Sequence, residues 1–310
     1  MKFISRRLGY ATLVMFLASL VTFFALRVAP GSVTSSLLNP STVTPERVAA
    51  LEKSLGLDDP AFVQYGRFMG KLLSGDLGNS IVSRVPVAEI IAHSAGYTVV
   101  LALASFALAF GLGVPAGVIA AIRKDSIVDR AIRVTASFLL AMPNFVLALL
   151  LILLFGVLLH TLPVSGANSW QSLILPAVAL GAEPAALTAR VTRTAFLEQR
   201  GMEFVTTLRA RGVSERRINW RHVLRNSLSS IISLGAVQIR NLLGYALIVE
   251  VIFRWPGLGY QLVQSILTRD YGVAQVLAIL LALVVVISSA LGDWALRIAD
   301  PRVRLSGKVS

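Results

Sequence analysis

Long apolar runs alternate with shorter polar segments along the whole chain. Six of the runs are long enough for a membrane-spanning helix, which needs about 20 mostly apolar residues to cross roughly 30 Å of hydrocarbon. They cover residues 8–28, 97–122, 131–159, 173–191, 228–253 and 273–298. The pattern therefore predicts an all-α integral membrane protein with six transmembrane helices. The first run exceeds the roughly 7–15 residues of a secretory signal core and has no convincing A-x-A site after it, which predicts a retained helix.

Lysine and arginine are unevenly distributed between the polar segments. If the N-terminus is cytoplasmic, the cytoplasmic segments hold 20 of the 29 basic residues and the external segments hold eight, while Arg240 falls within the fifth run. Membrane proteins carry such an excess on the cytoplasmic side. We therefore expect cytoplasmic N- and C-termini, an external helical segment between the first and second helices, and a cytoplasmic loop at about residues 192–227.

The composition excludes several kinds of chemistry. With 55% hydrophobic and 15% charged residues and a mean hydropathy of +0.74, the chain is more apolar than soluble domains usually are. It has no cysteine, which excludes disulfides, iron–sulfur clusters and thiol catalysis. The histidines His93, His160 and His222 are far apart, so no metal site is expected. Membrane topology explains the net charge of +13 better than nucleic-acid binding does.

The external segment, residues 30–95, is long enough to fold. One short helix is predicted from Thr44 to Gly56, and a second begins after Asp59-Pro60. The second helix has four possible packing residues, Phe62, Phe68, Met69 and Leu72. Residues 75–78 predict a turn. The segment is either an incidental hairpin or a lid or docking surface at the outer mouth. It divides the chain into an N-terminal part, residues 1–95, and a five-helix core, residues 96–310.

The cytoplasmic loop is strongly basic but has a regular construction. Arg200-Gly201 is predicted to end the fourth helix, residues 203–211 to form a short helix, and Gly212 to close it in the left-handed conformation. Ser214 is placed to cap a further helix along the membrane face, with Glu215 favourably placed in its first turn. Two interpretations stay open. The arginines anchor topology and bind anionic lipid, or the loop is a rigid knob for a cytoplasmic partner.

Two opposite charges are expected near the middle of the membrane. Glu183 lies about 15 Å into the fourth run at 1.5 Å per residue, and Arg240 reaches a similar depth in the fifth. Intramembrane charges are costly and usually functional. The pair either lines a translocation path or forms a structural salt bridge. Pro176 and Pro184 can kink the fourth run, and Pro143 can do the same in the third, either as ordinary membrane-helix kinks or as breaks that mark the path.

Several motifs follow one another in the order of a known family. EFVTTLRARG (203–212) and RHVLRNS (221–227) resemble the D-Y-V-R-T-A-R-A-K-G and R-H-A-L-R-N-A elements of ABC-importer permeases, although Glu-Ala-Ala itself is absent. The external GLDDPAFVQYGRFMGKLLSGDLGNSI (56–81) and the turn EVIFRWPGLG (250–259) are also similar to family elements, as are residues 269–271 and 300–302. The chain therefore resembles the dipeptide, oligopeptide and nickel branch of these permeases over nearly its whole length.

The resemblance implies an ABC type I importer permease fold in a bacterial inner membrane. It implies a second, homologous permease subunit, two cytoplasmic ATPases that bind ATP and magnesium, and an external substrate-binding protein. The coupling helix that docks on an ATPase would use Glu203, Phe204, Thr206, Thr207, Arg209, Ala210, Arg211 and Gly212. The external turn that guides substrate would use Glu250, Phe253, Pro256, Gly257 and Gly259, with its proline and two glycines specifying a tight re-entrant or scoop-like loop. Trp255 is expected at the membrane interface.

The chain is not expected to be an enzyme. Neither Gly70-Lys71 nor Gly307-Lys308 has the upstream glycine and the following Ser or Thr of a P-loop, so ATP hydrolysis is assigned to partner subunits. Di- or oligopeptides are the expected solute, with nickel, glutathione, a sugar or another small solute left open. A stand-alone secondary transporter would be expected to show internal repeats or many intramembrane charges, and the sequence shows neither. A membrane enzyme has no supporting Ser/His or Asp/Asp pair.

Overall fold

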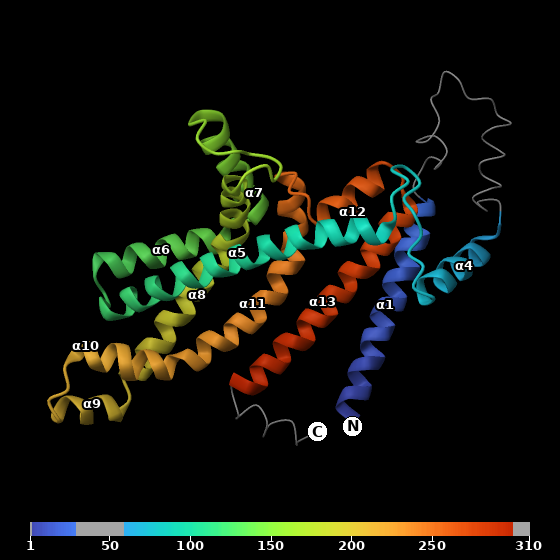
Figure 1. The fold of residues 1–310 in the computed structure, drawn as a ribbon. Helices are drawn as coiled ribbons and strands as arrows, with labels where there is room; N and C mark the ends of the chain where they lie inside the picture. Colours follow the sequence, from blue (N-terminus) through green and yellow to red (C-terminus); the bar gives the residue numbers. More distant parts are fainter. Residues whose placement is uncertain (1, 29–58, 300–310) are drawn as a thin grey trace. The chain divides into compact units, whose positions relative to one another are not determined.

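The computed structural model describes residues 2–28 and 59–299, which form helices and loops without a strand (Figure 1). The α-helices are α1 (Lys2–Val28), α4 (Ala61–Leu73), α5 (Val87–Ile122), α6 (Ile127–Ala141), α7 (Asn144–Leu151), α8 (Ile174–Arg200), α9 (Glu203–Ala210), α10 (Glu215–Arg217), α11 (Leu224–Ile252), α12 (Leu258–Leu267) and α13 (Tyr271–Ala299). Three further segments extend or join them, namely η1 (Ile152–Leu158), η2 (Trp170–Leu173) and η3 (Ile218–Val223). The helix predicted from Thr44 to Gly56 lies outside the described residues.

Six helical segments of the described chain have the length and apolarity of membrane spans, if one bent pair is taken as a single span. They are Gly9–Val28, Val87–Ile122, the pair Ile127–Ala141 and Asn144–Leu158, Trp170–Arg200, Glu215–Ile252 and Tyr271–Ala290. Each coincides with one of the apolar runs predicted from the sequence. The second, fourth and fifth segments are longer than their runs, because helical turns that contain polar residues extend them beyond the apolar stretch.

The third span is broken at Pro143, as the sequence predicted. Met142 is extended, with φ −90° and ψ 122°, and α7 begins at Asn144. Proline disfavours the helical conformation of the residue before it, so the two pieces meet at 105°. The fourth span is not interrupted, and the kinks expected there stay a prediction. Pro176 lies in the first turn of α8, where no intrahelical hydrogen bond is lost, and α8 continues through Pro184.

The chain folds as two compact units. One comprises the described residues up to residue 97 together with residues 256–286, and the other comprises residues 98–255 together with the described residues from 287 onward. The boundary predicted between residues 95 and 96 divides sequence segments and stays a prediction.

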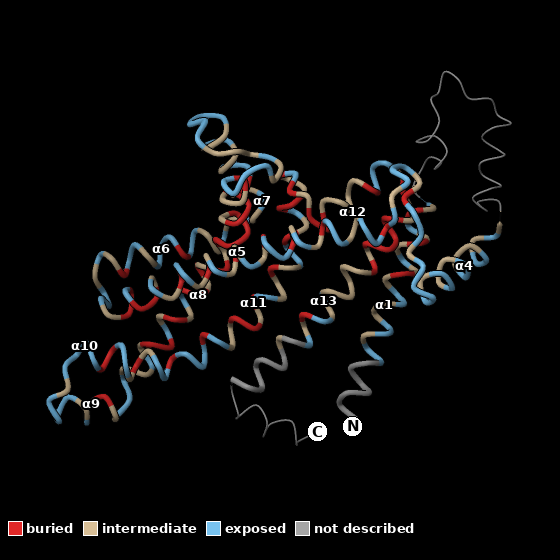
Figure 2. Tube along the Cα trace, viewed as in Figure 1, coloured by how far each residue is buried: buried red, intermediate tan, exposed pale blue. Residues whose placement is uncertain are grey.

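In the unit that contains residues 98–255, α8 is the central helix (Figure 2). It packs against α6, α7 and α11, and it approaches α5 at Gly113 and Gly117. A Cβ atom at Gly117 would lie 2.5 Å from the Ala189 carbonyl oxygen, so the absence of a side chain permits the close approach. In the most apolar window of α8, 67% of the residues are buried, against 22% for α5. Much of the apolar surface of α5 is therefore left for lipid or another subunit.

The other unit has its own core, in which external-segment residues participate. Val87 and Leu258 pack with Val273 and Leu277, and Phe68 of α4 and Leu77 of the following turn contact them. The buried Asp270 accepts hydrogen bonds from the Ser80 hydroxyl and from the amides of Ile81 and Val82. These contacts hold the chain after α4 against the start of α13.

The helix predicted after Asp59-Pro60 is confirmed as α4, and it lies beside α1. The ring centroids of Phe23 and Tyr65 are 5.1 Å apart, and the Ser19 and Tyr65 hydroxyls are hydrogen-bonded at 2.8 Å. Of the predicted packing residues, Phe68 joins the core, whereas Phe62 is 77% exposed. Gly75 and Gly78 have φ values of +83° and +72°, which confirms the predicted turn.

Candidate functional site

The short helix α9 is held at one end of its unit by a single buried side chain. Val205 is fully buried in a cluster with Val118 and Ala121 of α5, Phe196 of α8, and Ile218 and Val223 of η3. Phe204 and Leu208 pack against the same cluster. The apolar side of α9 therefore contacts three other helical segments, and displacement of α9 would press directly on their ends.

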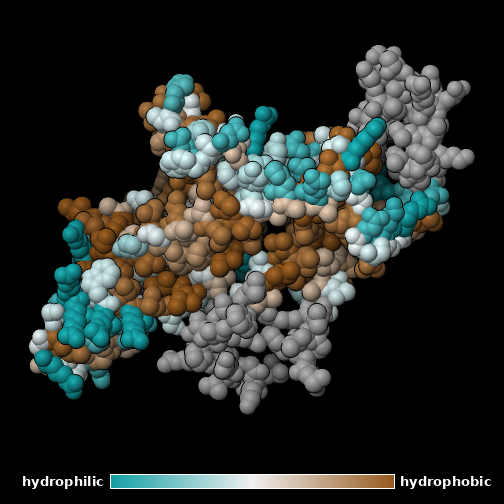
Figure 3. All heavy atoms as spheres, viewed as in Figure 1, coloured by the Kyte–Doolittle hydropathy of each residue, from teal (hydrophilic) through white to brown (hydrophobic). Residues whose placement is uncertain are grey.

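Most of the remaining surface of α9 is exposed. Of the residues predicted to contact an ATPase, Glu203, Thr206, Thr207, Arg209, Ala210, Arg211 and Gly212 are exposed, and Phe204 is half-buried. Figure 3 shows hydrophilic surface gathered over α9 and α10. The structure thus places seven of the eight residues on an accessible surface and turns Phe204 partly towards the cluster.

The local sequence explains how α9 begins and ends. Gly201 follows the last residue of α8, and the extended Met202 precedes α9. Gly212 has a φ of +75°, which confirms the predicted left-handed closure. Ser214 stands at the expected capping position, but its side chain makes no capping hydrogen bond.

The loop differs from the sequence prediction after Ser214. The expected second helix along the membrane face is not separate, because residues 215–252 form one helix of 38 residues. At 1.5 Å per residue this helix is about 57 Å long, against roughly 30 Å of hydrocarbon. The basic residues 216–225 are therefore on a projecting extension of the fifth span, and the true loop is limited to residues 201–214.

An ion-pair cluster closes this loop. Glu215 at the start of α10 contacts Arg209 of α9 at 2.5 Å and Arg200 at the end of α8 at 3.5 Å. The hydrogen bond to the Glu215 carboxylate raises the pKa of the Arg209 guanidinium above its ordinary value. Sequence reasoning gave Glu215 only a role in the first turn of a helix. Its position as the one acid among arginines, just across a glycine turn, was the available signal.

The predicted intramembrane charges are not paired with each other. Glu183 of α8 and Arg240 of α11 are both partly buried, and no ion pair or hydrogen bond joins them in the described part of the chain. The salt bridge that the sequence left open as an alternative does not form within this chain. Glu183 lies beside the buried Pro184.

The turn after α11 is built differently from the sequence expectation. Glu250 is fully buried and accepts a hydrogen bond of 2.7 Å from the Thr98 hydroxyl. Phe253 is 1% exposed, and its carbonyl oxygen accepts the Gly166 amide. Trp255 is also buried, at 4% exposed, which contradicts its expected place at the lipid interface. Its amide donates to the Glu250 carbonyl oxygen at 2.9 Å.

The glycines of this turn do not supply its left-handed residue. Arg254 has a φ of +48°, whereas Gly257 has a φ of −85° and precedes α12. Pro256 is partly buried, and Gly259 is buried inside α12. The motif thus leads into a helix of 10 residues, a feature that the interpretation as a scoop-like loop did not include.

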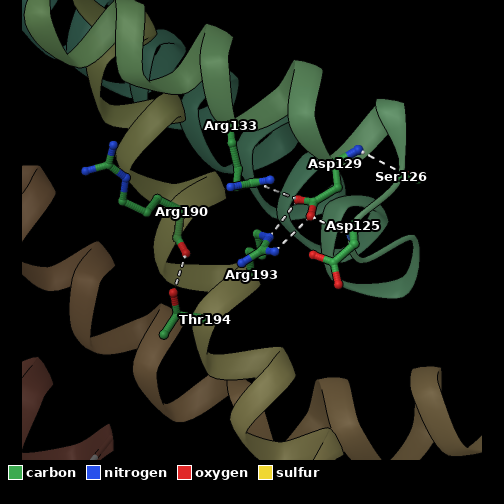
Figure 4. A network of polar contacts seen from close by, with 7 residues as sticks. All are labelled: Asp125, Ser126, Asp129, Arg133, Arg190, Arg193 and Thr194. Atoms are coloured by element: carbon green, nitrogen blue, oxygen red, sulfur yellow. Dashed lines mark hydrogen bonds and ion pairs between the residues drawn. The ribbon is translucent and has the colours of Figure 1, made fainter.

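The structure adds a polar network that the sequence analysis missed (Figure 4). The carboxylate of Asp129 in α6 is fully buried and accepts hydrogen bonds from Nε and Nη2 of Arg193 in α8, at 2.7 and 2.8 Å. It also accepts the Asp125 amide at 3.0 Å and contacts Arg133 at 3.3 Å. The network ties α6 and the loop before it to α8. Its sequence signal was only an acidic residue in a basic segment.

The arrangement of these helices matches a known class of membrane protein. Inward-facing crystal structures of the MetNI methionine ABC transporter contain a chain with the same fold, with a TM-score of 0.57 and 20% identity over 68% of this chain and 96% of that one. A second crystal form gives a TM-score of 0.55 with 19% identity. The likeness confirms the ABC-importer permease fold expected from the sequence.

The family is established at the level of sequence. Residues 113–305 match the family described as binding-protein-dependent transport system inner membrane component, and residues 1–102 match its N-terminal membrane component. The chain belongs to this family. It is 36% identical to the glutathione transport system permease protein GsiC of Escherichia coli O6:H1 strain CFT073, over 94% of each chain. It is 34% identical to the di/tripeptide transport system permease protein DppB of Pseudomonas aeruginosa strain UCBPP-PA14, over 98% of this chain and 99% of that one.

Family membership settles the broad class of function. The chain is an integral membrane permease of an ABC importer, and its relatives are transport proteins rather than enzymes. A binding-protein-dependent system implies a substrate-binding protein and ATPase subunits as partners.

Proposed function

We propose that this chain forms half of the translocation pathway for a peptide-like solute in a bacterial plasma membrane. It would pair with a second homologous permease, receive solute from an external binding protein, and be driven by two ATPases that bind ATP and Mg²⁺. Both termini would be cytoplasmic. The GsiC and DppB relatives support a di- or oligopeptide, with glutathione as one member of this class.

The geometry of α9 carries the coupling part of the proposal. A helix that transmits force needs one part anchored and another accessible, and α9 has the buried Val205 together with five exposed residues, followed by the exposed Arg211 and Gly212. The Glu215 contacts with Arg209 and Arg200 add a second link to neighbouring helices. Motion of the ATPase would pass through α9 to α5, α8 and α11. Rocking of packed helices then gives alternating access.

The path itself is assigned to residues around the middle of α8 and α11. Glu183 and Arg240 carry charge at membrane depth without pairing to each other, which supports a role towards a zwitterionic solute or a partner subunit. A peptide-like solute offers both an ammonium and a carboxylate to such groups. Glu250, Phe253, Pro256, Gly257 and Gly259 would shape the outer entrance.

Cross-linking tests the coupling assignment directly. The chain contains no cysteine, so single cysteines at Thr206 or Ala210 can carry a benzophenone label without removal of native thiols. In the assembled transporter, we expect illumination to join either position to an ATPase subunit. A cysteine at the exposed Ser74, after α4, is the matched control and should give no such product. Failure at both α9 positions, or an ATPase product from Ser74, would contradict the assignment.

Uptake into proteoliposomes tests the transport assignment. The complete complex, with binding protein and internal ATP, should accumulate radiolabelled glutathione or a dipeptide. Full-speed uptake by this chain alone, driven by an ion gradient without ATPases, would instead identify a secondary transporter. Uptake of nickel or a sugar in place of the peptides would support the assignment as an importer and contradict the assignment of a peptide-like solute.

A further inference from the structure

A basic pocket lies between α6 and α8 and has no assigned role. It has a volume of about 270 Å³ and is lined by three arginines, Arg133, Arg190 and Arg193, together with the hydroxyl residues Ser137 and Thr194 and apolar side chains. It adjoins the Asp129 network of Figure 4 but extends beyond it.

The charges lining this pocket are not balanced. Asp129 accepts hydrogen bonds from Nε and Nη2 of Arg193 and also contacts Arg133. One negative charge therefore faces two guanidinium groups. Arg190 donates to the Ser137 hydroxyl at 3.1 Å, and no carboxylate of the described residues pairs with it. In Figure 4 its side chain points away from Asp129. Arg190 therefore offers an uncompensated guanidinium to an anion.

The surroundings of the pocket favour an amphiphilic anion. On α6, Val134 and Phe138 are 63% and 62% exposed and lie four residues apart, on the face next to that of Arg133 and Ser137. Guanidinium groups match phosphate oxygens with two parallel hydrogen bonds, and a hydroxyl adds another donor. A ligand that places phosphate by the arginines and hydrocarbon along Val134 and Phe138 would satisfy both surfaces.

We propose that this pocket binds the headgroup phosphate of an anionic phospholipid, with Arg190 as the principal contact. The predicted topology puts these ends of α6 and α8 at the cytoplasmic side, where basic pockets between helices bind anionic headgroups. A lipid seated there would bridge α6 and α8 only 10 residues before α8 ends at Arg200 and leads into α9. The proposal requires the membrane setting and does not depend on the transported solute.

Native mass spectrometry of the complete transporter tests the proposal. Detergent-solubilised complex is titrated with phosphatidylglycerol and, separately, with phosphatidylcholine. The wild type should retain phosphatidylglycerol preferentially. Arg190→Gln should weaken this binding about five-fold, which corresponds to about 1 kcal/mol for one cationic side chain near the membrane surface. Arg190→Lys should keep part of it, because the charge remains.

Arg130→Gln is the matched control. Arg130 is an exposed arginine of α6, the helix that forms the other wall of the pocket, but it does not line the pocket, so its loss should leave phosphatidylglycerol binding unchanged. Equal binding by wild type and Arg190→Gln would overturn the proposal. If millimolar inorganic phosphate competes with phosphatidylglycerol, the proposal of a lipid ligand is wrong and the pocket binds a soluble anion. Protection of the pocket from hydrogen exchange by the second permease, with or without lipid, would make it a protein interface instead.

Discussion

Asp129 is a fully buried carboxylate, and its main partner, Arg193, is only 19% exposed. Asparagine at position 129 would keep the shape but leave this guanidinium without its counter-charge, a change that costs about 3–5 kcal/mol for a buried pair. We therefore expect Asp129→Asn to lower the thermal unfolding midpoint of the purified complex clearly. Asp125→Asn is the control, because Asp125 is exposed and asparagine tolerates its φ of +64°. Equal midpoints for Asp129→Asn and wild type would show that the pair is not needed.

Substitution of Arg240 tests whether this residue lines the translocation path or only stabilises the fold. Leucine keeps much of the bulk of this side chain but removes its charge and its hydrogen-bond donors. Each hydrogen bond to a charged group contributes about 1.5–3 kcal/mol of net stabilisation. If Arg240 lines the path, Arg240→Leu should reduce ATP-dependent uptake about ten-fold or more, while the assembled complex still elutes at its normal size. Arg240→Lys should retain part of the uptake. Wild-type uptake by a correctly assembled Arg240→Leu transporter would remove Arg240 from the path.

Individual contacts were the part of the site least accessible to sequence reasoning. Asp129 and Arg193 are 64 residues apart in the chain, and no periodic pattern connects two such positions. The turn after α11 was assigned to its glycines, yet Arg254 carries the positive φ. Trp255 was placed at the lipid interface from its residue type alone, whereas packing within the chain buries it. Each of these features depends on tertiary contacts.

At the scale of helices, the approach of α5 to α8 depends on glycine. An alanine Cβ at position 117 would meet the Ala189 carbonyl oxygen at 2.5 Å and the Thr192 Cβ at 2.6 Å, so the helices must separate. Overpacking of this kind costs about 1–3 kcal/mol. We expect Gly117→Ala to lower the unfolding midpoint. Gly111→Ala in the same helix, where a Cβ meets nothing within 4 Å, should be neutral or slightly stabilising.

Gly212 closes α9 in a conformation that costs alanine about 1–2 kcal/mol. Its φ is +75°, and open space surrounds the Cβ position, so the effect of Gly212→Ala is conformational rather than steric. If a rigid α9 transmits motion, this variant should transport less solute per ATP hydrolysed. Gly201→Ala, at a φ of −82°, is the paired control and should behave as wild type. Gly212→Asn should recover most of the loss. If Gly212→Ala transports as much solute per ATP hydrolysed as the wild type, the conformation of this turn is not needed for coupling.

The sequence predicted which helices form better than it predicted where they begin and end. Apolar runs located all six spans because hydrocarbon imposes both composition and length. Pro143 and Gly212 were correctly interpreted, since their backbone restrictions are local. The continuity of residues 215–252 was missed because polar, basic turns at the start of a span look like a separate surface helix. Only packing of Ile218 and Val223 with Val205 shows that these turns belong to the buried cluster.

For the whole molecule, the apolar surface that remains exposed indicates further partners. Large side chains such as Leu103, Leu112 and Phe138 are each more than 60% exposed. Patches of this kind mark contacts with lipid or protein. In the proposed assembly, lipid or the second permease would cover these residues.

Membrane orientation is the whole-molecule property on which the proposed role of α9 depends. The absence of native cysteine makes single-cysteine labelling unambiguous. In intact spheroplasts, an impermeant maleimide should label Ser74→Cys, whereas Ala210→Cys should be labelled only after permeabilisation. Both positions are exposed, so accessibility within the chain does not bias the result. The cysteine-free wild type measures background. The reverse pattern would place α9 outside the cell, where no ATPase could reach it, and would invalidate the positive-inside argument together with the coupling role.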